Sequence, residues 1–388
     1  MKLEDYLAGG YTQQYQYRSF SPTPVNHAWL IDDGAVQSLL SDADRILGEL
    51  NAFSQLVPDV DFFIRMHIAK EATQSSRIEG TRTNIEEALL GAQDIEPEKR
   101  NDWEEVQNYI KAINQSIEQL PTLPLSNRLL KQTHYTLMQG VRGEAKQPGE
   151  FRASQNWIGM SLKNAVFIPP HHDEVAELMS DLEKFIHNDS VPVPHLIKIA
   201  IAHYQFETIH PFLDGNGRLG RLFIALYFAH FGLLHKPALY LSDFFERNKT
   251  AYVDHLMGVR EANKIKEWIL FFLYGVKETA ENSIQVFKDI LTLKAHLDSE
   301  VLPHFSTRRQ ANAQALVRHL YQKPLVTIKS IATLLDVQIN TATDLINDFV
   351  QYDILQEITG NSRNQMFGFS RYLLLFNARY PTQPDTNT

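Results

Sequence analysis

Apolar residues recur at the spacing of one helix face through most of the chain, from Val36 to Val350. This pattern predicts a mainly α protein, whose long helices are ended by glycine or proline. The helices expected before residue 306 cover residues 36–50, 58–79, 84–87, 97–119, 126–139, 172–187, 194–208, 216–231, 242–257 and 265–301.

Two stretches depart from the helical spacing. Residues 1–35 are rich in Tyr, Gln and Pro with weak periodicity, so we expect an arm that wraps the surface. Between Gly140 and Pro170, Gly, Pro, Asn and Ser accumulate, and short apolar runs at 156–159 and 165–168 flank a polar turn. Such a pair of runs predicts a small β-hairpin in an otherwise helical protein.

A separate unit is expected from Thr307 onward. Its pattern predicts helices at 307–321, 327–335 and 339–350, followed by a β-wing from Ile354 to Phe369. Helix, helix-turn-helix and wing is the element order of a winged helix, so the fold expected at 306–372 is winged-helix-like. The polar tail at 381–388 is expected to be disordered.

Composition narrows the class of protein. The 388 residues are 44% hydrophobic and 21% charged, with a net charge of −9 that gives no global attraction to nucleic acid or anionic lipid. The chain has no cysteine, which excludes disulfides and thiol catalysis. Its polar N-terminus does not fit a signal peptide, and the most apolar run, 222–234, is too short to span a bilayer. A cytoplasmic protein without a membrane anchor is therefore expected.

The candidate chemistry lies in a polar loop, residues 210–221, between two apolar helical runs. Gly215, Asn216 and Gly217 open a helix, where free backbone N–H groups and the helix dipole form an anion cradle. Arg218 and Arg221 lie three residues apart and so share a helix face, as suits a grip on phosphate oxygens.

Two further side chains of this loop complete the expected site. Asp214 stands just before the cradle, where a carboxylate can hold a divalent cation against the same phosphates. His210 is the side chain there that can accept a proton near neutral pH. Cradle, cation ligand and base together predict nucleotide-phosphate chemistry.

An acid at a helix end is the second unusual feature. Glu79 is expected in the last turn of the 58–79 helix, against the helix dipole, and Gly80 after it is expected to be a left-handed cap. Ser75, four residues earlier, shares the face of Glu79. An acid in this place requires a cation, or it is simply solvated.

The loop matches the signature of the Fic family, His-Pro-Phe-x-Asp/Glu-Gly-Asn-Gly-Arg-x-x-Arg, at every fixed position. Residues 203–209 resemble the lead-in helix of that family, and 148–152 followed by 156–159 resemble the region that enters its flap. The resemblance implies a Fic-type helical bundle. The implied domains are an N-terminal arm with an inhibitory helix at 1–94, a Fic core at 95–300 with its flap at 156–168, and the winged-helix-like unit.

The resemblance implies transfer of AMP from ATP to a Ser, Thr or Tyr hydroxyl of a protein, with release of pyrophosphate. By this analogy His210 is the catalytic base and Asp214 holds Mg²⁺. The nucleotide would be bound by Gly215, Asn216, Gly217, Arg218, Leu219, Gly220, Arg221 and, less firmly because Val253 replaces a second tyrosine, Tyr252. The flap would bind the target as an added strand through Asn156, Trp157, Ile158, Gly159, Val166 and Phe167.

Ser75, Glu79 and Gly80 also fit the inhibitory motif of the family, Ser/Thr-x-x-x-Glu-Gly/Asn, in the N-terminal position of its class II members. The implied pairing joins Glu79 to Arg221 and keeps the enzyme off. In some relatives the same glutamate supports removal of AMP, and both activities remain open here. Self-modification and a homodimer are further expectations from the family.

Other functions remain open. His203, Glu207 and His210 have the spacing of a helical metal site, as in a hydrolase, although Pro211 would end that helix, and His171 and His172 could also bind a metal. The C-terminal unit could make the protein a transcriptional regulator with a degenerate enzyme site. Its 339–350 helix lacks Lys and Arg, so a structural or protein-binding role is preferred to DNA binding. Transfer of UMP or another group remains an alternative to AMP.

Overall fold

The computed structural model describes residues 1–56, 60–141, 145–360 and 365–376. The protein is mainly α, as expected, with 64% of its residues in helices. The helices up to the functional loop are α1 (Gly34–Leu56), α2 (Val60–Ile78), α3 (Ile85–Ala88), α4 (Arg100–Gln119), α5 (Asn127–Leu137), α6 (Val175–His187) and α7 (His195–Ile209). Those after it are α8 (Asn216–His230), α9 (Ser242–Arg247), α10 (Lys249–Ala262), α11 (Ile265–His296), α12 (Thr307–Gln322), α13 (Ile328–Leu335), α14 (Ile339–Gln351) and α15 (Ser370–Leu374).

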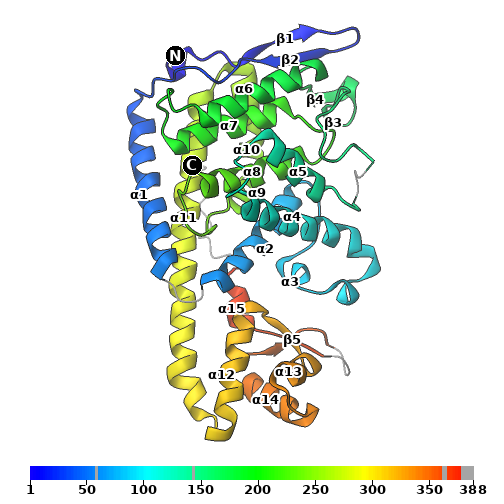
Figure 1. The fold of residues 1–388 in the computed structure, drawn as a ribbon, viewed down its shortest axis with the longest axis vertical. Coiled ribbons are helices and arrows are strands. Elements are labelled where there is room, and N and C mark those ends of the chain that lie inside the picture. Colours follow the sequence, from blue (N-terminus) through cyan, green and yellow to red (C-terminus); the bar gives the residue numbers. More distant parts are fainter. Residues whose placement is uncertain (57–59, 142–144, 361–364, 377–388) are drawn as a thin grey trace, which may run out of the picture.

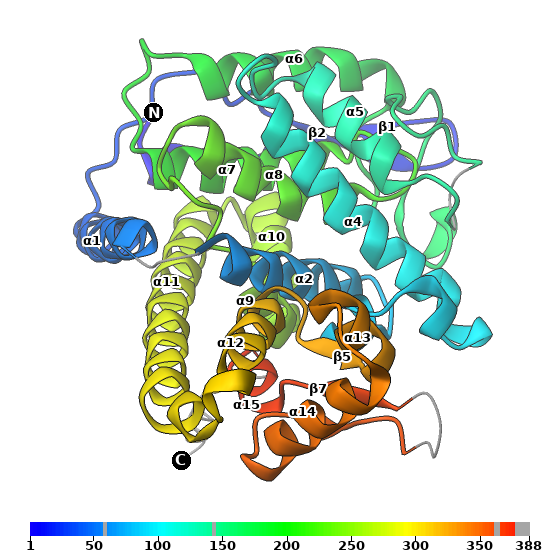
Figure 2. The ribbon, with the colours of Figure 1, turned by 60° about the horizontal axis from the view of Figure 1, so that its bottom comes forward.

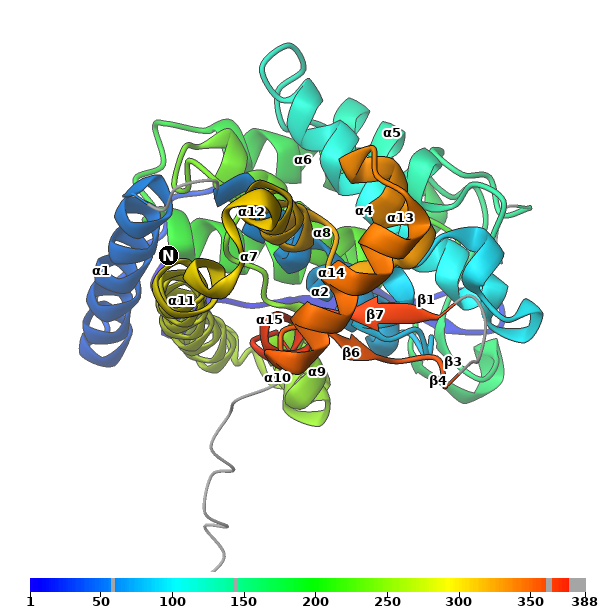
Figure 3. The same ribbon diagram turned by 90° about the horizontal axis from the view of Figure 1, so that it is seen from below.

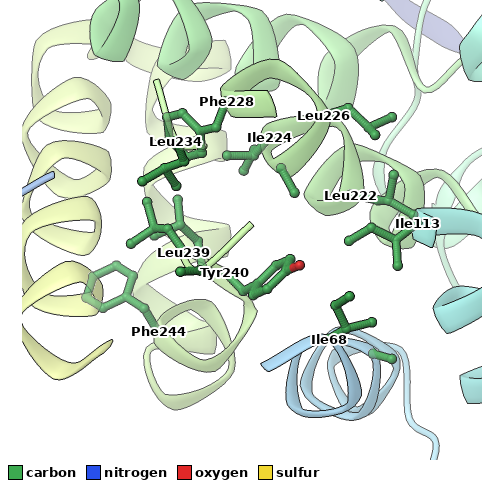
Figure 4. Close-up of a cluster of buried hydrophobic side chains, with 14 of the residues drawn as sticks. Ile68, Ile113, Leu222, Ile224, Leu226, Phe228, Leu234, Leu239, Tyr240 and Phe244 are labelled. Atoms are coloured by element: carbon green, nitrogen blue, oxygen red, sulfur yellow. The ribbon is translucent and has the colours of Figure 1, made fainter. Parts of the chain in front are cut away.

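Helices α7 and α8 form the centre of the core. Every residue of α7 after His195 is buried, and so are nearly all of those in α8. A helix that is apolar all round needs neighbours on every side. Here α2, α4, α5 and α6 cover the two helices together with α11, and Figure 4 shows Leu222, Ile224, Leu226 and Phe228 of α8 among apolar side chains of several elements. The loop between α7 and α8 is therefore held between two buried helices.

The N-terminal arm is more ordered than the sequence suggested. It contains a hairpin of β1 (Gly9–Gln13) and β2 (Arg18–Pro22), which pair antiparallel. All five residues of β1 are exposed, so the strand lacks the alternation that reveals a half-buried strand. Phe20 of β2 is buried against Phe167 of the flap, and its backbone N–H donates to the Ile168 carbonyl at 2.9 Å.

The predicted flap is present as β3 (Ile158–Gly159) and β4 (Ala165–Phe167), with a register shift between Ile158 and Gly159. The hairpin β1–β2 lies on the same side of the molecule as this flap (Figure 1). The arm thus packs on the end of β4, through Phe20.

Two predicted helices differ from the structure. The 242–257 helix is divided into α9 and α10 at Asn248, whose φ of −110° and ψ of 33° leave the helical region while its side chain donates to the Phe244 carbonyl at 2.9 Å. Asparagine competes for backbone groups in this way. The long helix is regular only to His296, and a wider π-helical turn at Leu297–Val301 follows it. Figure 1 shows α11 running down from the core with α1 along its side.

Residues 307–376, here called the C-terminal unit, have the predicted order of helices. The β-strands are β5 (Leu325–Thr327), β6 (Gln356–Glu357) and β7 (Met366–Gly368), paired in the order β5, β7, β6, and the short helix α15 after them was not predicted. Figure 3, seen from below, shows α14 beside the β6 and β7 strands. The element order fits a winged helix, and that assignment stays a prediction, as do the domain boundaries. Part of the wing and the tail at 381–388 lie outside the described residues.

The C-terminal unit packs on α2. The rings of Tyr321 and Phe63 meet edge to face with centroids 5.8 Å apart, and Phe376 lies against His67. Figure 2 shows α2 between the unit and the core. Among the described helices, none combines the length and apolar character that a membrane crossing needs.

Candidate functional site

The functional loop begins with a strained residue. His210 follows the last turn of α7 in the left-handed region, with a φ of 51°. A non-glycine residue keeps this conformation only where its surroundings hold it. Buried Arg152 donates to the His210 carbonyl from Nε at 3.0 Å and to the Ile209 carbonyl at 3.3 Å, and the Asn156 amide donates to the His210 carbonyl at 3.1 Å.

Asn216 closes the other half of the loop. Its side-chain oxygen accepts from the Phe212 N–H and its amide donates to the Phe212 carbonyl, both at 2.8 Å. The side chain of Asn216 is thus engaged with the loop itself. Gly215, with a φ of 74°, precedes the first residue of α8, and no side chain caps this helix. The first N–H groups of α8 are consequently available to an anion.

A pocket of about 460 Å³ opens in front of this helix start. It is lined by the loop, the end of α2, the flap and α10. Its predicted members are Glu79, Trp157, Ile158, Val166, Phe167, His210, Asp214, Gly215, Asn216, Gly217, Arg221 and Tyr252. The structure leaves six other predicted site residues out of the lining: Ser75, Asn156, Gly159, Arg218, Leu219 and Gly220.

Arg221 is bound by the end of α2. Its Nε donates to Ser75 Oγ at 2.9 Å, and its Nη2 donates to the Ser75 carbonyl at 2.8 Å and to Glu79 Oε1 at 2.7 Å. The expected left-handed cap is present, with Gly80 at a φ of 103°. Burial acts to raise the pKa of Glu79, but the charge and hydrogen bond of Arg221 outweigh it, so this pKa lies below its usual value.

The Glu79 carboxylate also lies over the first turn of α8. A Cβ atom added to Gly217 would collide with Glu79 Oε1 and come 3.1 Å from Arg221 Nη1, so the carboxylate would have to shift. Negative charge is favoured at a helix N-terminus. The carboxylate therefore lies where the loop is best suited to bind another anion.

Arg218 lies deeper. Its Nη1 pairs with Glu105 Oε2 of α4 at 3.0 Å, and its Nη2 contacts the Met138 sulfur at 3.5 Å. Both partners of the ion pair are almost completely buried. Leu219 is part of the core, and Gly220 packs against Glu207. The expected contact of Arg218 with nucleotide phosphates stays a prediction, because in this structure its guanidinium pairs with Glu105 inside the core.

His210 is neutral at physiological pH. Its pKa is lowered to about 4 by burial first, then by the charges of Arg260 and Arg152, against the opposite effect of Glu79 and the Glu207 carbonyl. The buried Glu207 side chain lines the same pocket, and burial raises its pKa to about 7. Such perturbed groups in a cleft are typical of functional sites.

Asp214 is a partly exposed carboxylate of the pocket lining. Its Oδ1 accepts from the Gly215 N–H at 2.7 Å, and its Oδ2 pairs with partly exposed Lys146 at 3.2 Å. Carboxylate oxygens next to a phosphate cradle suit a hard divalent ion such as magnesium. The donor set thus fits the expected metal, provided that Lys146 gives way.

The flap residues divide into two groups. Trp157, Gly159 and Val166 are exposed, as is Met160, and Ile158 is partly exposed, so these can meet another protein. Asn156 and Phe167 are buried beneath them, where Asn156 holds the loop carbonyls and Phe167 packs on the arm. Asn156 and Phe167 would therefore affect a bound target by holding the flap in place.

The arrangement of His203 does not favour a hydrolase metal site. One ring nitrogen of His203 lies 3.0 Å from the Gly220 carbonyl and the other 2.9 Å from the Tyr252 hydroxyl, so both are engaged. The same contact holds Tyr252 at the pocket wall. Across the described residues, the only cluster of three or more His, Asp or Glu side chains close enough to share a metal ion is His171, His172 and Asp173, just before α6.

The C-terminal unit offers little support for DNA binding. Asp344 and Asp348 of α14 pair with Arg309 of α12 at 3.4 and 2.8 Å. The charge of Arg309, next to this helix, is therefore already neutralised by the two aspartates.

Sequence reasoning missed several pocket residues. Arg260 and Lys249 of α10 line the pocket, and Lys249 donates to the Ile78 carbonyl at the end of α2 at 2.6 Å. Arg152, which lies outside the pocket lining, was predicted only as part of the segment 148–152 that resembles the family, without a role of its own. No spacing pattern marks these cations, because their partners are backbone carbonyls far away in the sequence.

Comparison with known families gives two matches. Residues 37–118 match the model described as Fic/DOC family N-terminal, and residues 124–228 match that of the Fic/DOC family, which includes the functional loop.

Curated relatives carry the name "Protein adenylyltransferase Fic". The protein of Drosophila erecta is 33% identical over 114 residues, which are 29% of this chain and 21% of that protein. The protein of Drosophila yakuba is 24% identical over 224 residues, 54% of this chain and 43% of that protein. The chain thus spans less than half the length of these relatives.

Solved structures share the fold. A Fic family protein from Desulfovibrio desulfuricans aligns over 88% of this chain and 98% of its own, with a TM-score of 0.55 and 19% identity. A Fic domain containing signaling protein from Bacteroides thetaiotaomicron aligns over 66% of this chain and 97% of its own, with a TM-score of 0.50 and 17% identity. Together with the matched family models, these findings identify the chain as a member of the Fic family.

Proposed function

We propose that this protein is a class II Fic adenylyltransferase that moves AMP from ATP to a hydroxyl of a protein, itself included. The observation that carries the proposal is the pocket, which unites a neutral buried imidazole, an uncapped helix N-terminus and the Arg221 guanidinium. The names of the curated relatives add the identity of the transferred group.

The geometry suggests how the chain's own residues act. The N–H groups at the start of α8 bind phosphate oxygens, and Arg221 binds the terminal phosphate. His210 takes the proton of the target hydroxyl as its oxygen attacks the α-phosphorus, and the bond from that phosphorus to the β-phosphate oxygen breaks, releasing pyrophosphate. Asp214 would hold magnesium, which would neutralise charge on the phosphates. The exposed flap residues bind an extended target segment by strand addition.

Regulation follows from the position of Glu79. Its carboxylate occupies both Arg221 and the space above Gly217, so a polyphosphate must displace it. We propose that this contact holds the enzyme off. The side chain of Glu79 is 39% exposed, whereas that of Arg221 is only 2% exposed, so the acid is the partner that moves.

Labelled-nucleotide transfer tests the proposal. ATP labelled at the α-phosphate is offered to wild type, Glu79→Gly and His210→Ala, with GTP, CTP and UTP in parallel. We expect Glu79→Gly to incorporate label about 10- to 100-fold faster than wild type, as loss of a charge-assisted competitor implies. No label is expected from γ-labelled ATP, and His210→Ala should be inactive.

The exposed His235 provides a matched control, since His235→Ala should behave as wild type. Transfer that survives in His210→Ala would refute the mechanism. Equal transfer in wild type and Glu79→Gly would refute the regulation. If another nucleotide is the preferred substrate, the mechanism stands, but the transferred group is the monophosphate of that nucleotide and not AMP.

A further inference from the structure

Arg260 is a buried cation of the pocket lining that takes no part in the transfer step proposed for His210, Arg221 and Asp214. It lies in the last turn of α10, with 7% of its surface exposed. Its hydrogen-bond partners are neutral, and within the described part of the chain no ion pair joins it to a carboxylate. Burying an arginine in this way is costly unless its contacts organise something that the protein needs.

Those contacts converge on the turn that carries His210. The Nε of Arg260 donates to Thr208 Oγ1 and its Nη2 donates to the Glu207 carbonyl, both at 3.1 Å. Thr208 and Glu207 are in the last turn of α7, directly before the left-handed His210. Arg152 holds the following carbonyls of the same turn. Two buried guanidiniums thus fix a backbone conformation that is unfavourable for histidine.

The same guanidinium also contacts the flap. Its central carbon lies 3.9 Å from the centroid of the Phe167 ring, a cation–π distance. Phe167 belongs to β4 and is the register partner of Ile158 in β3. A rigid connection therefore runs from the flap, through one side chain, to the turn before His210.

We propose that Arg260 is a positioning residue, which locks the turn of α7 carrying His210 to flap strand β4, so that the imidazole meets a target bound on the flap. The inference rests on the proposed transfer function and deepens it. Displacing reacting groups by about 1 Å can cost about 100-fold in rate, so such a lock has a measurable effect.

The lock has a second consequence, for the protonation of His210. The charged side chains that act on its ring are Arg260 of α10, Arg152 and Glu79. The other charged side chains of the same pocket are those of Lys146, Glu207, Asp214, Arg221 and Lys249. The charge of Arg260 disfavours the imidazolium. The Glu207 carbonyl favours it, but this carbonyl accepts a hydrogen bond from Arg260, and His210 Nδ1 has no hydrogen-bond partner among the described residues.

Replacing Arg260 by methionine removes this charge and releases the Glu207 carbonyl. Both changes favour the protonated ring. Because the pKa of His210 is about 4 in the native protein, the ring should begin to protonate at higher pH in the variant.

The test is a titration of the His210 ring by NMR in the full chain. The histidines are labelled with ¹³C, and the His210 signal is the one absent from His210→Gln. In Arg260→Met we expect the midpoint to move upward by about one pH unit, as loss of a nearby charge implies. In Arg260→Lys, which keeps the charge, the midpoint should stay near that of wild type.

Transfer is measured on the same variants in the Glu79→Gly background. Arg260→Met should lose about 100-fold in transfer, with the acid limb of its pH profile moved upward. Arg260→Lys should recover part of the rate without that movement. Arg247→Met on α9, whose arginine makes surface ion pairs, is the control and should match the background protein.

An unmoved His210 midpoint in folded Arg260→Met would overturn the proposal, as would equal transfer in both Arg260 variants and the control. Should Arg260→Met fail to fold, an Arg260→Lys protein with full transfer and a flap as protected from hydrogen exchange as in wild type would also overturn it. The His210 midpoint could also move in Arg260→Met while no variant transfers any nucleotide. That result would refute the proposed function and leave the positioning role of Arg260 supported.

Discussion

The two arginines of the functional loop lie one helical turn apart and have opposite surroundings. Arg218 points toward α4 and pairs with Glu105, and both side chains are at most 4% exposed. Arg221 points toward α2 and pairs with Glu79, whose side chain is 39% exposed. The motif treats the two positions alike. The structure gives one a permanent partner inside the core and the other a partner at the pocket surface.

This difference separates a structural charge from an exchangeable one. A fully buried pair loses several kcal/mol when one partner is removed, because the remaining charge cannot be solvated. A half-exposed carboxylate returns to water at little cost. An anionic ligand can therefore replace Glu79, whereas nothing in the pocket reaches Glu105.

The largest expected effect comes from Glu105→Ala. It leaves the Arg218 guanidinium buried without its carboxylate, so the free energy of unfolding should fall by about 3–5 kcal/mol. Glu79→Ala should lower it by about 1–2 kcal/mol, because Arg221 lines the open pocket and keeps its two hydrogen bonds to Ser75. Urea unfolding of the two variants measures the difference, and equal losses would end the distinction between the two pairs.

Gly217→Ala is expected to have the next largest effect. The new Cβ would collide with Glu79 Oε1 and lie 3.1 Å from Nη1 of the buried Arg221, so the carboxylate must shift and the free energy of unfolding should fall by about 1–2 kcal/mol. In the Glu79→Gly background the same change should cost much less. A double-mutant cycle checks this coupling, and additive effects would contradict it.

Ser75→Ala should have a smaller effect. It removes the hydroxyl that accepts from Arg221 Nε at 2.9 Å, at a cost of about 1 kcal/mol in the free energy of unfolding. Ser76 is a matched control, since its buried hydroxyl has no hydrogen-bond partner in the described part of the chain, and Ser76→Ala should cost nothing. Equal losses in the two serine variants would show that the bond to Arg221 does not matter.

The smallest effect is the pH dependence of the Glu79 pair. Its folded pKa is lowered, so the folded state binds fewer protons than the unfolded state. The stability that Glu79 contributes is therefore complete above the ordinary pKa of 4.5 and is lost as pH falls through the folded value. Unfolding of wild type and Glu79→Gln from pH 3 to 7 should diverge with rising pH, and a constant gap would contradict the shift.

Local patterns predicted much of the fold and the centre of the site. Helical spacing found nearly all long helices, and the contiguous loop from His210 to Arg221 already contained the base, the carboxylate and the cradle. The hairpin β1–β2 was missed because β1 buries none of its residues. The break at Asn248 was missed because the apolar spacing continues through it.

The sequence by itself determined which groups are available and which of them lie on one helix turn, since both follow from residue type and helical period. Only the tertiary structure decided which charge is compensated. Glu105 is 113 residues from Arg218 and Glu79 is 142 from Arg221, and Arg260 reaches the turn before His210 from another helix. Such pairings depend on how helices distant in the sequence pack, and packing also decides the burial that makes each charge permanent or exchangeable.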